Sequence, residues 1–176
     1  AEKTLRKCVE SLCYGEERNL EIILIDDCSG DNSWDLCNTL SKEFRNVRCY
    51  QNEHNSGVSF TRNYGLEVAT APYILFVDSD DWTSCRYASI LLDSAEKNID
   101  AIPVCGYVYI NHVTYSRTIA AYSEERVNTV KMADAFSWID HVLLQQLWNK
   151  VFCRELIEKH HIRFDESQSM GEDFQF

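Results

Sequence analysis

The chain has 176 residues, of which 45% are hydrophobic and 26% are charged. This length and composition are typical of one globular domain and exclude disorder, collagen and a coiled coil as descriptions of the whole chain. Its 17 Lys and Arg residues face 28 Asp and Glu residues, which gives a net charge of -11. Duplex nucleic acid is therefore not expected as a partner, because phosphate binding needs a basic face. No apolar run approaches the ~18 residues of a membrane helix.

The eight cysteines are scattered through the sequence without any CxxC pair. A structural zinc site needs such close pairs, so it is not predicted. Most of the cysteines lie in apolar periodic stretches, which is typical of small buried hydrophobic side chains in a reducing compartment. The sequence therefore predicts a cytoplasmic protein without disulfides.

The first half of the sequence predicts alternating helices and strands. Apolar residues at three- and four-residue spacing predict a helix over residues 5–12. The apolar run 20–25 (LEIILI) is typical of a buried parallel strand, and it ends in an acid-rich loop. We expect Asp31 or Ser33 to cap the helix that follows. Residues 47–50 (VRCY) predict a second short strand.

The same pattern is repeated further along. Gly57 predicts a turn before another helix, whose inner side is expected to include Val58. Residues 73–77 (YILFV) form the most apolar predicted strand and run directly into the acidic residues 78–81 (DSDD). The next predicted helix is expected to bury Ile90.

The second half is less regular. Residues 100–110 predict a strand, residues 129–147 and 153–161 predict helices, and residues 115–128 are polar and poorly patterned. Repetition of strand, acid-rich loop and helix predicts an α/β protein with an open, mostly parallel sheet. Ligands bind beyond the carboxyl ends of the strands in such sheets, and both acidic loops lie there.

The two acidic loops are candidate binding sites. Asp78, Asp80 and Asp81 place three carboxylates in four positions, and a bound hard cation would offset their repulsion. A solvated loop with helix-capping acids is an equally open interpretation. Residues 26–31 (DDCSGD) do not match a calcium-binding loop, and taken alone they favour a turn with a helix cap. A strand-end Asp also suits hydrogen bonds to a nucleobase edge or a ribose.

Three further segments have both a chemical and a structural interpretation. Arg62 could pair with phosphate bidentately or lie on the surface. The pair Glu172–Asp173 could supply a general base or begin a helix. Residues 148–150 (WNK) are typical of structural packing. The sequence contains no P-loop, no GxGxxG fingerprint and no GxSxG elbow.

The order of these segments is more specific than any one of them. Five segments resemble motifs of the family 2 glycosyltransferases: 26–33 (DDCSGDNS), 55–65 (NSGVSFTRNYG), 73–82 (YILFVDSDDW), 147–152 (LWNKVF) and 171–173 (GED). The third contains the family's DxD motif. The resemblance implies a GT-A-type three-layer sandwich, nucleotide-diphospho-sugar transferase-like, with a mostly parallel central sheet. It also implies one catalytic domain over 1–176, divided into a nucleotide-binding half, 1–98, and an acceptor-side half, 99–176.

The resemblance assigns roles on the donor side. Asp27, with Asp26, is implied to contact the donor's base, usually uracil, and Arg62 is implied to lie by the nucleotide. The carboxylates implied to hold a divalent cation, Mn²⁺ or Mg²⁺, and the donor's ribose or diphosphate are Asp80 with Asp78 or Asp81. A carboxylate-held cation would reconcile an acidic protein with an anionic substrate.

The resemblance also implies the reaction. Asp173 is the implied catalytic base, with Glu172 beside it. The implied partners are a nucleotide-diphospho-sugar donor, usually a UDP-sugar, and a saccharide or lipid-linked saccharide acceptor, with inversion at the anomeric carbon. The implied setting is bacterial cell-surface polysaccharide assembly in the cytoplasm, either free or at the inner face of the cell membrane through parts outside this segment.

The sequence departs from the family pattern in several places, among them Phe60 and Thr61, which replace smaller residues before Arg62. The family begins with an apolar strand that shapes the nucleotide pocket, whereas this sequence begins in the helix that follows that strand. It also stops three residues after Asp173, so we expect an incomplete domain. Cys28 stands where glycine is usual. Two other classes stay open: a non-catalytic nucleotide- or sugar-binding relative, and a nucleotidyltransferase that would release pyrophosphate.

Overall fold

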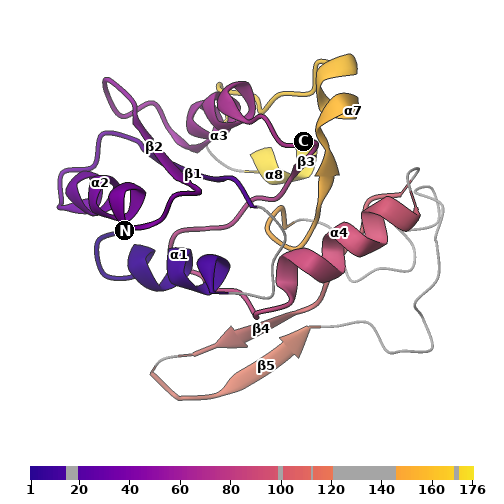
Figure 1. Cartoon of the computed structure of the whole chain (residues 1–176), viewed down its shortest axis with the longest axis horizontal. Helices are drawn as coiled ribbons and strands as arrows, with labels where there is room; N and C mark the ends of the chain where they lie inside the picture. The colour runs from indigo at the N-terminus through magenta and orange to yellow at the C-terminus, as the bar shows by residue number, and fades with distance from the viewer. Residues whose placement is uncertain (15–19, 99–100, 112, 121–145, 169–170) are drawn as a thin grey trace.

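The computed structural model describes residues 1–14, 20–98, 101–111, 113–120, 146–168 and 171–176 (Figure 1). The helices are α1 (Leu5–Cys13), α2 (Ser33–Glu43), α3 (Val58–Val68), α4 (Tyr87–Lys97), α7 (Arg154–Lys159) and α8 (Glu172–Gln175). The strands are β1 (Ile22–Asp26), β2 (Val47–Gln51), β3 (Tyr73–Ile74), β4 (Tyr107–Ile110), β5 (Arg117–Ala120) and β6 (Phe152–Cys153). None of the helices in this described part combines the length and hydropathy needed to span a membrane.

The α/β class is confirmed, but the strand pairing is more mixed than the sequence predicts. β1 and β2 pair in parallel, with Ile22 opposite Val47 at the start of the register. β3 and β6 pair antiparallel, as do β4 and β5. β6 follows β3 by almost 80 residues, so its return to β3 is not visible in the local α/β repetition of the first half. Among the described strands, only β1 and β2 therefore form a parallel pair.

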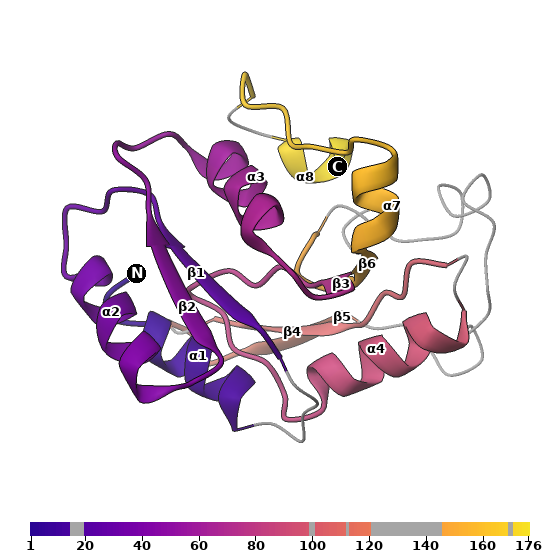
Figure 2. The ribbon, with the colours of Figure 1, turned by 45° about the horizontal axis from the view of Figure 1, so that its top comes forward.

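The described residues form three buried clusters; the smallest consists of Leu91, Ala95 and Val151, and the other two position the site. In the first, α1 and α2 lie along one side of the β1–β2 pair and α3 lies on the other side (Figure 2). Its buried residues are Leu5, Val9, Ile22, Cys37, Leu40 and Val47. The apolar spacing on α1 and the apolar run of β1 are thus both used to bury the same cluster. This packing aligns the carboxyl ends of β1 and β2 at one edge.

The second core joins the end of β3 to the C-terminal part of the chain. Its buried residues are Leu66, Leu147, Phe152, Ile157 and Phe164, with Phe76 and Phe176 packed against them. The stacked rings of Phe164 and Phe176 have centroids 4.2 Å apart. Phe76 meets both of those rings edge-on, at 5.5 Å and 5.6 Å. Such aromatic pairs add about 0.5–1.5 kcal/mol beyond their area burial.

Several local predictions need correction. The N-cap of α2 is Asn32, and the Asp31 carboxylate instead accepts a bond from the Ser33 amide at 3.0 Å. Val58 and Ile90 are 42% and 49% exposed, so neither faces the interior. Both residues lie in the first turns of their helices, where an apolar side chain can extend past the packed face. The corrections concern single residues, because the helices themselves form where they were predicted.

Other predictions differ in extent. The predicted strand 73–77 pairs only over Tyr73–Ile74. The poorly patterned stretch 115–128 begins with β5, which forms a hairpin with β4. The helix predicted over 129–147 falls almost entirely outside the described residues. The helix predicted over 153–161 is confirmed as α7.

All eight cysteines are free, in agreement with the prediction of no disulfides. Cys8 and Cys37 are buried, and burial raises the pKa of the Cys8 thiol to about 12 and that of Cys37 to about 11. Cys28 and Cys85 are exposed, so the expectation of burial does not hold for them.

Asn63 ties α3 to the segment that follows α7, and we expect Asn63→Ala to destabilise the fold by about 2–4 kcal/mol. Its amide donates to the Phe164 carbonyl at 3.0 Å and accepts from the Phe164 amide at 2.9 Å. Alanine would leave both backbone groups buried without these bonds. Urea unfolding measures the change. The control is Asn38→Ala, which removes a bond within α2, to Trp34, and a weak bond from the Cys49 thiol, and should cost less.

Candidate active site

The DSDD segment, residues 78–81, forms a turn three residues after the end of β3. The Asp81 amide donates to the Asp78 carbonyl at 3.0 Å, which closes the turn. Helix α1 holds this turn from the other side: Cys8 Sγ donates to the Asp78 carbonyl at 3.6 Å, and the Lys7 ammonium lies 3.1 Å from the centroid of the Trp82 ring. Asp80 and Asp81 are exposed. The turn therefore presents carboxylates to solvent at the end of an apolar strand.

Arg62 lies at the centre of the site, because its guanidinium contacts acids from two distant parts of the chain. Its Nη1 donates to Glu172 Oε1 at 3.0 Å and also to Asp173 Oδ1. Its Nη2 lies 3.6 Å from Asp78 Oδ1. The Arg62 side chain is 14% exposed, so these ion pairs are partly shielded from water. The fold thereby joins three of the predicted motifs around one cation.

Backbone geometry places both partners of this contact. Arg62 is in the second turn of α3, which starts after Gly57 at φ 87°. Glu172 and Asp173 are the first residues of α8, which starts after Gly171 at φ 82°. Both glycines have left-handed backbone conformations that other residues adopt at a cost. The two interpretations of the acid pair thus coincide, since it begins a helix and also faces the site.

Packing holds α8 in place although the helix is short. Phe176 caps its C-terminal end and belongs to the aromatic cluster of the second core. Phe164, which stacks on Phe176, also lies 5.4 Å from the Arg62 guanidinium carbon. The sequence analysis did not identify either aromatic residue. Their pattern is not periodic, so no local signal could have identified them.

The two acids of α8 are shifted in opposite directions. For Asp173, burial is the main cause of a raised pKa; the Glu172 charge adds to it and Arg62 opposes it. For Glu172, burial alone would raise the pKa, but hydrogen bonds from its own amide and from Asp173, with the Arg62 charge, outweigh burial and lower it. Two adjacent carboxylates with separated pKa values are typical of acid–base sites.

Asp78 and Asp81 both have raised pKa values. Burial is the main cause for each, and the neighbouring carboxylates of the turn add to it, while Arg62 opposes the shift at Asp78. The turn therefore carries more negative charge than its surroundings compensate. Among the described residues, however, no group of three or more His, Cys, Asp or Glu side chains is arranged to hold a metal ion.

The carboxylates of the turn fit a metal site in which the protein supplies only one or two ligands. Mg²⁺ and similar ions commonly use one or two carboxylates and complete their coordination with waters and substrate phosphates. The exposed Asp80 and half-exposed Asp78 could supply such carboxylates, without a closed cage of three. The assignment of Asp78, Asp80 and Asp81 to a metal therefore stays a prediction.

Asp27 organises the loop that precedes α3. Its Oδ1 accepts from the Asn52 side chain and the Ser56 amide, each at 2.8 Å, and its Oδ2 accepts from the Gly57 amide at 2.8 Å. Burial raises its pKa, but these bonds outweigh burial and lower it. Asn52 is a member of the site that the sequence analysis missed. Contact of Asp27 with a nucleobase stays a prediction.

Because its pKa is lowered in the folded state, Asp27 stabilises the fold above its ordinary pKa of 3.8, and this contribution is lost as the pH falls through the lower folded value. We expect Asp27→Asn to destabilise the chain at pH 7 and to lose less additional stability between pH 7 and pH 3 than the wild type. Urea unfolding at both pH values measures this. Asp35→Asn, at an exposed acid of α2, should leave the wild-type pH dependence in place.

Asp26, predicted to share the contact with the base, is 5% exposed. Its Oδ2 accepts from the Ser29 amide at 3.1 Å and from the Gln51 side chain at 3.0 Å. These bonds indicate that Asp26 shapes the loop after β1. In the same loop Cys28 has φ 55°, a left-handed conformation that favours glycine. This conformation explains why glycine is the usual residue at this position of the motif.

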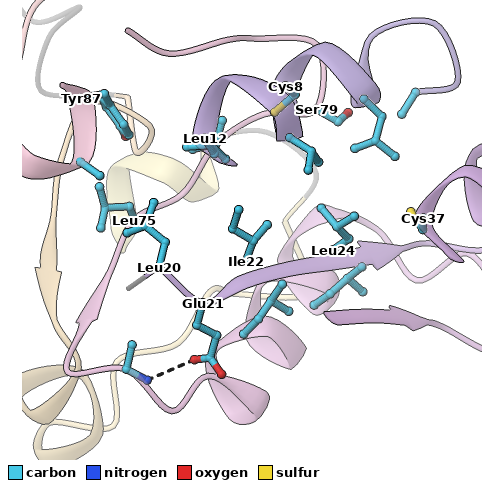
Figure 3. A pocket seen from close by; sticks show the side chains of 18 of the residues that line it. Cys8, Leu12, Leu20, Glu21, Ile22, Leu24, Cys37, Leu75, Ser79 and Tyr87 are labelled. Carbon is cyan, nitrogen blue, oxygen red and sulfur yellow. Dashed lines mark hydrogen bonds between the residues drawn. The ribbon is translucent and has the colours of Figure 1, made fainter. Parts of the chain in front are cut away.

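A cavity of about 700 Å³ lies between β1 and residues 71–79, beneath α1 (Figure 3). Leu20, Ile22 and Leu24 point into it from the β1 side, opposite Cys8 and Leu12. Its polar end reaches Asp26, Asp27 and Ser79, whereas Arg62, Glu172 and Asp173 do not line it. β1 pairs with β2 on its other edge. The cavity thus runs along the remaining edge of β1 towards the acidic turn.

Residues 148–150 are structural, as their residue types indicate. Asn149 is fully buried, and the Tyr87 hydroxyl donates to the Trp148 carbonyl at 2.6 Å. Lys150 is 7% exposed and its ammonium donates to Asn149 Oδ1 at 3.0 Å. Burial lowers the pKa of Lys150 to about 8, and the Asp173 charge opposes that shift. Lys150 is therefore a buried cation whose charge interacts with that of Asp173.

Known proteins resemble this chain in sequence. EpsJ of Bacillus subtilis (strain 168), an uncharacterized glycosyltransferase, is 28% identical over 179 residues, with 99% of this chain and 51% of EpsJ covered. The minor teichoic acid biosynthesis protein GgaB of the same organism is 31% identical over 163 residues, with 88% of this chain and 17% of GgaB covered. The chain thus spans about half of EpsJ and less of GgaB.

Solved structures agree on the fold. The crystal structure of S. aureus TarS 1-349 in complex with UDP has a TM-score of 0.74 at 19% identity, covering 98% of this chain and 49% of that chain. The TarS 1-349 complex with UDP-GlcNAc has a TM-score of 0.68 at 18% identity, covering 93% of this chain and 45% of that chain. The predicted GT-A-type α/β fold is confirmed by this likeness. The sequence profile described as glycosyl transferase family 2 matches residues 1–160, and the chain belongs to this family.

Proposed function

We propose that this chain is the donor-binding and catalytic region of an inverting glycosyltransferase that moves a sugar from a nucleotide-diphospho-sugar to an acceptor hydroxyl. The observation that carries the proposal is the contact of Arg62 with both the β3-end acid Asp78 and the acid pair Glu172–Asp173. This contact brings together Arg62 and Asp78, which could bind a diphosphate or its cation, and Asp173, which could accept a proton. A UDP-sugar is the proposed donor, supported by the TarS complexes with UDP and UDP-GlcNAc.

Asp173 is the proposed general base. The acceptor oxygen forms a bond to the anomeric carbon, its proton passes to the Asp173 carboxylate, and the nucleoside diphosphate departs with the electron pair of the broken C–O bond. A pKa raised by burial moves this carboxylate towards the working pH, where a base is most effective. Glu172, with its lowered pKa, stays ionised beside it.

The donor side is proposed to consist of Asp27, Arg62 and the acidic turn. Arg62 presents a planar fork that matches phosphate oxygens, and its guanidinium already lies at the end of β3. A divalent cation, Mn²⁺ or Mg²⁺, held by Asp80 with Asp78 or Asp81, would neutralise charge on the leaving diphosphate. The division into a donor half, 1–98, and an acceptor half, 99–176, stays a proposal, and the site draws residues from both.

The acceptor is proposed to be a saccharide or lipid-linked saccharide of a cell-surface polymer. The relatives support this: GgaB is named for minor teichoic acid biosynthesis, and a Staphylococcus epidermidis relative, 25% identical, is named a teichoic acid poly(glycerol phosphate) polymerase. Each of these relatives is several times longer than the matched region. Activity of the whole protein is therefore part of the proposal.

Calorimetric titration with UDP, GDP, CDP and dTDP, each with and without Mn²⁺, tests the proposal. We expect one nucleotide, UDP, to bind tightly only when the metal is present. Equal binding with and without Mn²⁺ would contradict the metal assignment. Binding of a nucleoside triphosphate with release of pyrophosphate would favour a nucleotidyltransferase.

The cavity beside β1 suggests a control experiment for the case in which no nucleotide binds. Apolar side chains of β1 and α1, among them Leu5, Val9 and Ile22, line most of this cavity. A version extended at the N-terminus by an apolar strand should fill it. If the extended version binds UDP and the shorter one does not, an incomplete pocket is the cause. If neither binds, the proposed function fails.

A further inference from the structure

Both terminal nitrogens of the Arg62 guanidinium face carboxylates in this structure. Nη1 bonds to Glu172 and Asp173, while Nη2 lies 3.6 Å from Asp78. The Phe164 ring lies below the guanidinium carbon at 5.4 Å and limits where the group can move. One cation thus serves three acids, two of which come from α8 and one from the turn after β3.

A diphosphate presents to an arginine the same kind of acceptor as a carboxylate, a pair of charged oxygens matched to the guanidinium fork. Nη1 has two N–H donors, and the structure uses both of them for the carboxylates of α8, so a phosphate that binds across Nη1 and Nη2 must displace one of these bonds. A bound diphosphate at Arg62 would therefore compete with Glu172 and Asp173. This competition rests on the proposed function, which puts the donor beside Arg62.

We propose that Arg62 is a positioning residue shared between the donor's diphosphate and the acid pair, so that donor binding releases Asp173 from its ion pair. Without donor, Arg62 holds the Asp173 carboxylate and keeps it from accepting a proton. With donor, the phosphate oxygens take over Nη1 and Asp173 can face the acceptor hydroxyl. The base becomes active only when there is a sugar to transfer.

Competition of this kind is reciprocal: the diphosphate weakens the ion pairs of Arg62 with the acid pair by the same free energy by which those ion pairs weaken diphosphate binding. Removing the charge of Asp173 should therefore tighten diphosphate binding. We expect Asp173→Asn to bind UDP with Mn²⁺ about tenfold more tightly than wild type, the size of one charge-assisted hydrogen bond. Glu172→Gln should also tighten UDP binding. This variant replaces Asp173→Asn in the test if Asp173→Asn does not fold.

Two controls separate this exchange from a general loss of negative charge. Asp165→Asn removes one exposed carboxylate from the segment before α8 and should leave UDP affinity unchanged, because Asp165 bonds to Ser167 rather than to Arg62. In an Arg62→Ala background, Asp173→Asn should no longer tighten binding. Calorimetry on all of these variants, each checked for folding by circular dichroism, measures the coupling.

The outcomes are distinct. Tighter UDP binding by the Asp173 and Glu172 variants that disappears without Arg62 supports the exchange. Unchanged or weaker binding by both variants, in a chain whose wild type binds UDP, overturns the exchange and leaves the proposed function standing. Equal tightening with and without Arg62 also overturns it, because the effect would then be simple charge repulsion. If no version binds UDP, the proposed function fails and the exchange fails with it.

Discussion

Asp173→Asn is expected to lower turnover by about 100- to 10,000-fold, the usual contribution of a general base, while UDP binding is retained. The amide is nearly the same shape as the carboxylate and can still contact Arg62, but it cannot accept the proton of the acceptor hydroxyl. Of the pair Glu172–Asp173, Asp173 is the acid whose pKa is raised, chiefly by burial, so it is the better base of the two. The measurement is sugar transfer by the full-length protein under saturating donor.

Asp165→Asn is the matched control for this result. It makes the same chemical change at an exposed acid eight residues earlier, where the carboxylate only bonds locally to Ser167. Its turnover should remain near wild type. If Asp173→Asn transfers sugar at the wild-type rate, Asp173 is not the base, and Glu172→Gln becomes the next variant to assay.

Asp80→Ala is expected to abolish metal-dependent nucleotide binding. Asp80 is exposed in the turn after β3, and it also lines a cavity of about 470 Å³ with Ala1–Thr4, Asp31 and Ser79. A cation held by one or two carboxylates and the substrate's phosphates cannot lose a carboxylate and keep its affinity. Titration of UDP with and without Mn²⁺ should therefore show the same weak binding in both cases.

Asp35→Ala, at an exposed acid on α2, removes the same charge far from the turn and should keep the metal effect. Because Asp80 is exposed, its replacement is also expected to leave thermal stability within about 0.5 kcal/mol of wild type. Metal-dependent UDP binding that survives Asp80→Ala would reassign the metal to Asp78 and Asp81, or remove it from the proposal.

Local patterns predicted the elements of the first half well. The apolar spacing of residues 5–12 corresponds to α1, and the run 20–25 corresponds to β1, because burial of one helix stripe or of a whole strand leaves a periodic mark in the sequence. The predictions were least accurate for where strands end. Only two residues of the predicted strand 73–77 pair, since its partner β6 is itself only two residues long.

The candidate site was predicted only as a set of separate segments. Each acid and Arg62 was identified on its residue type and its place in a motif. Asn52, Phe164 and Phe176 were not, although they bond to Asp27 or form the packing behind Arg62 and α8. These residues carry no periodicity and no unusual chemistry, so only their positions in space show what they do.

The sequence by itself determined the class of fold and the family, because both depend on the order and spacing of short motifs along the chain. Tertiary structure alone decided that Arg62 meets Asp173, a residue 111 positions away, and that one guanidinium serves both the β3 turn and α8. The physical reason is that hydrophobic periodicity records which face of a segment is buried, but not which distant segment covers it. That choice is made by the packing of the aromatic cluster, which brings the last helix back to the end of β3.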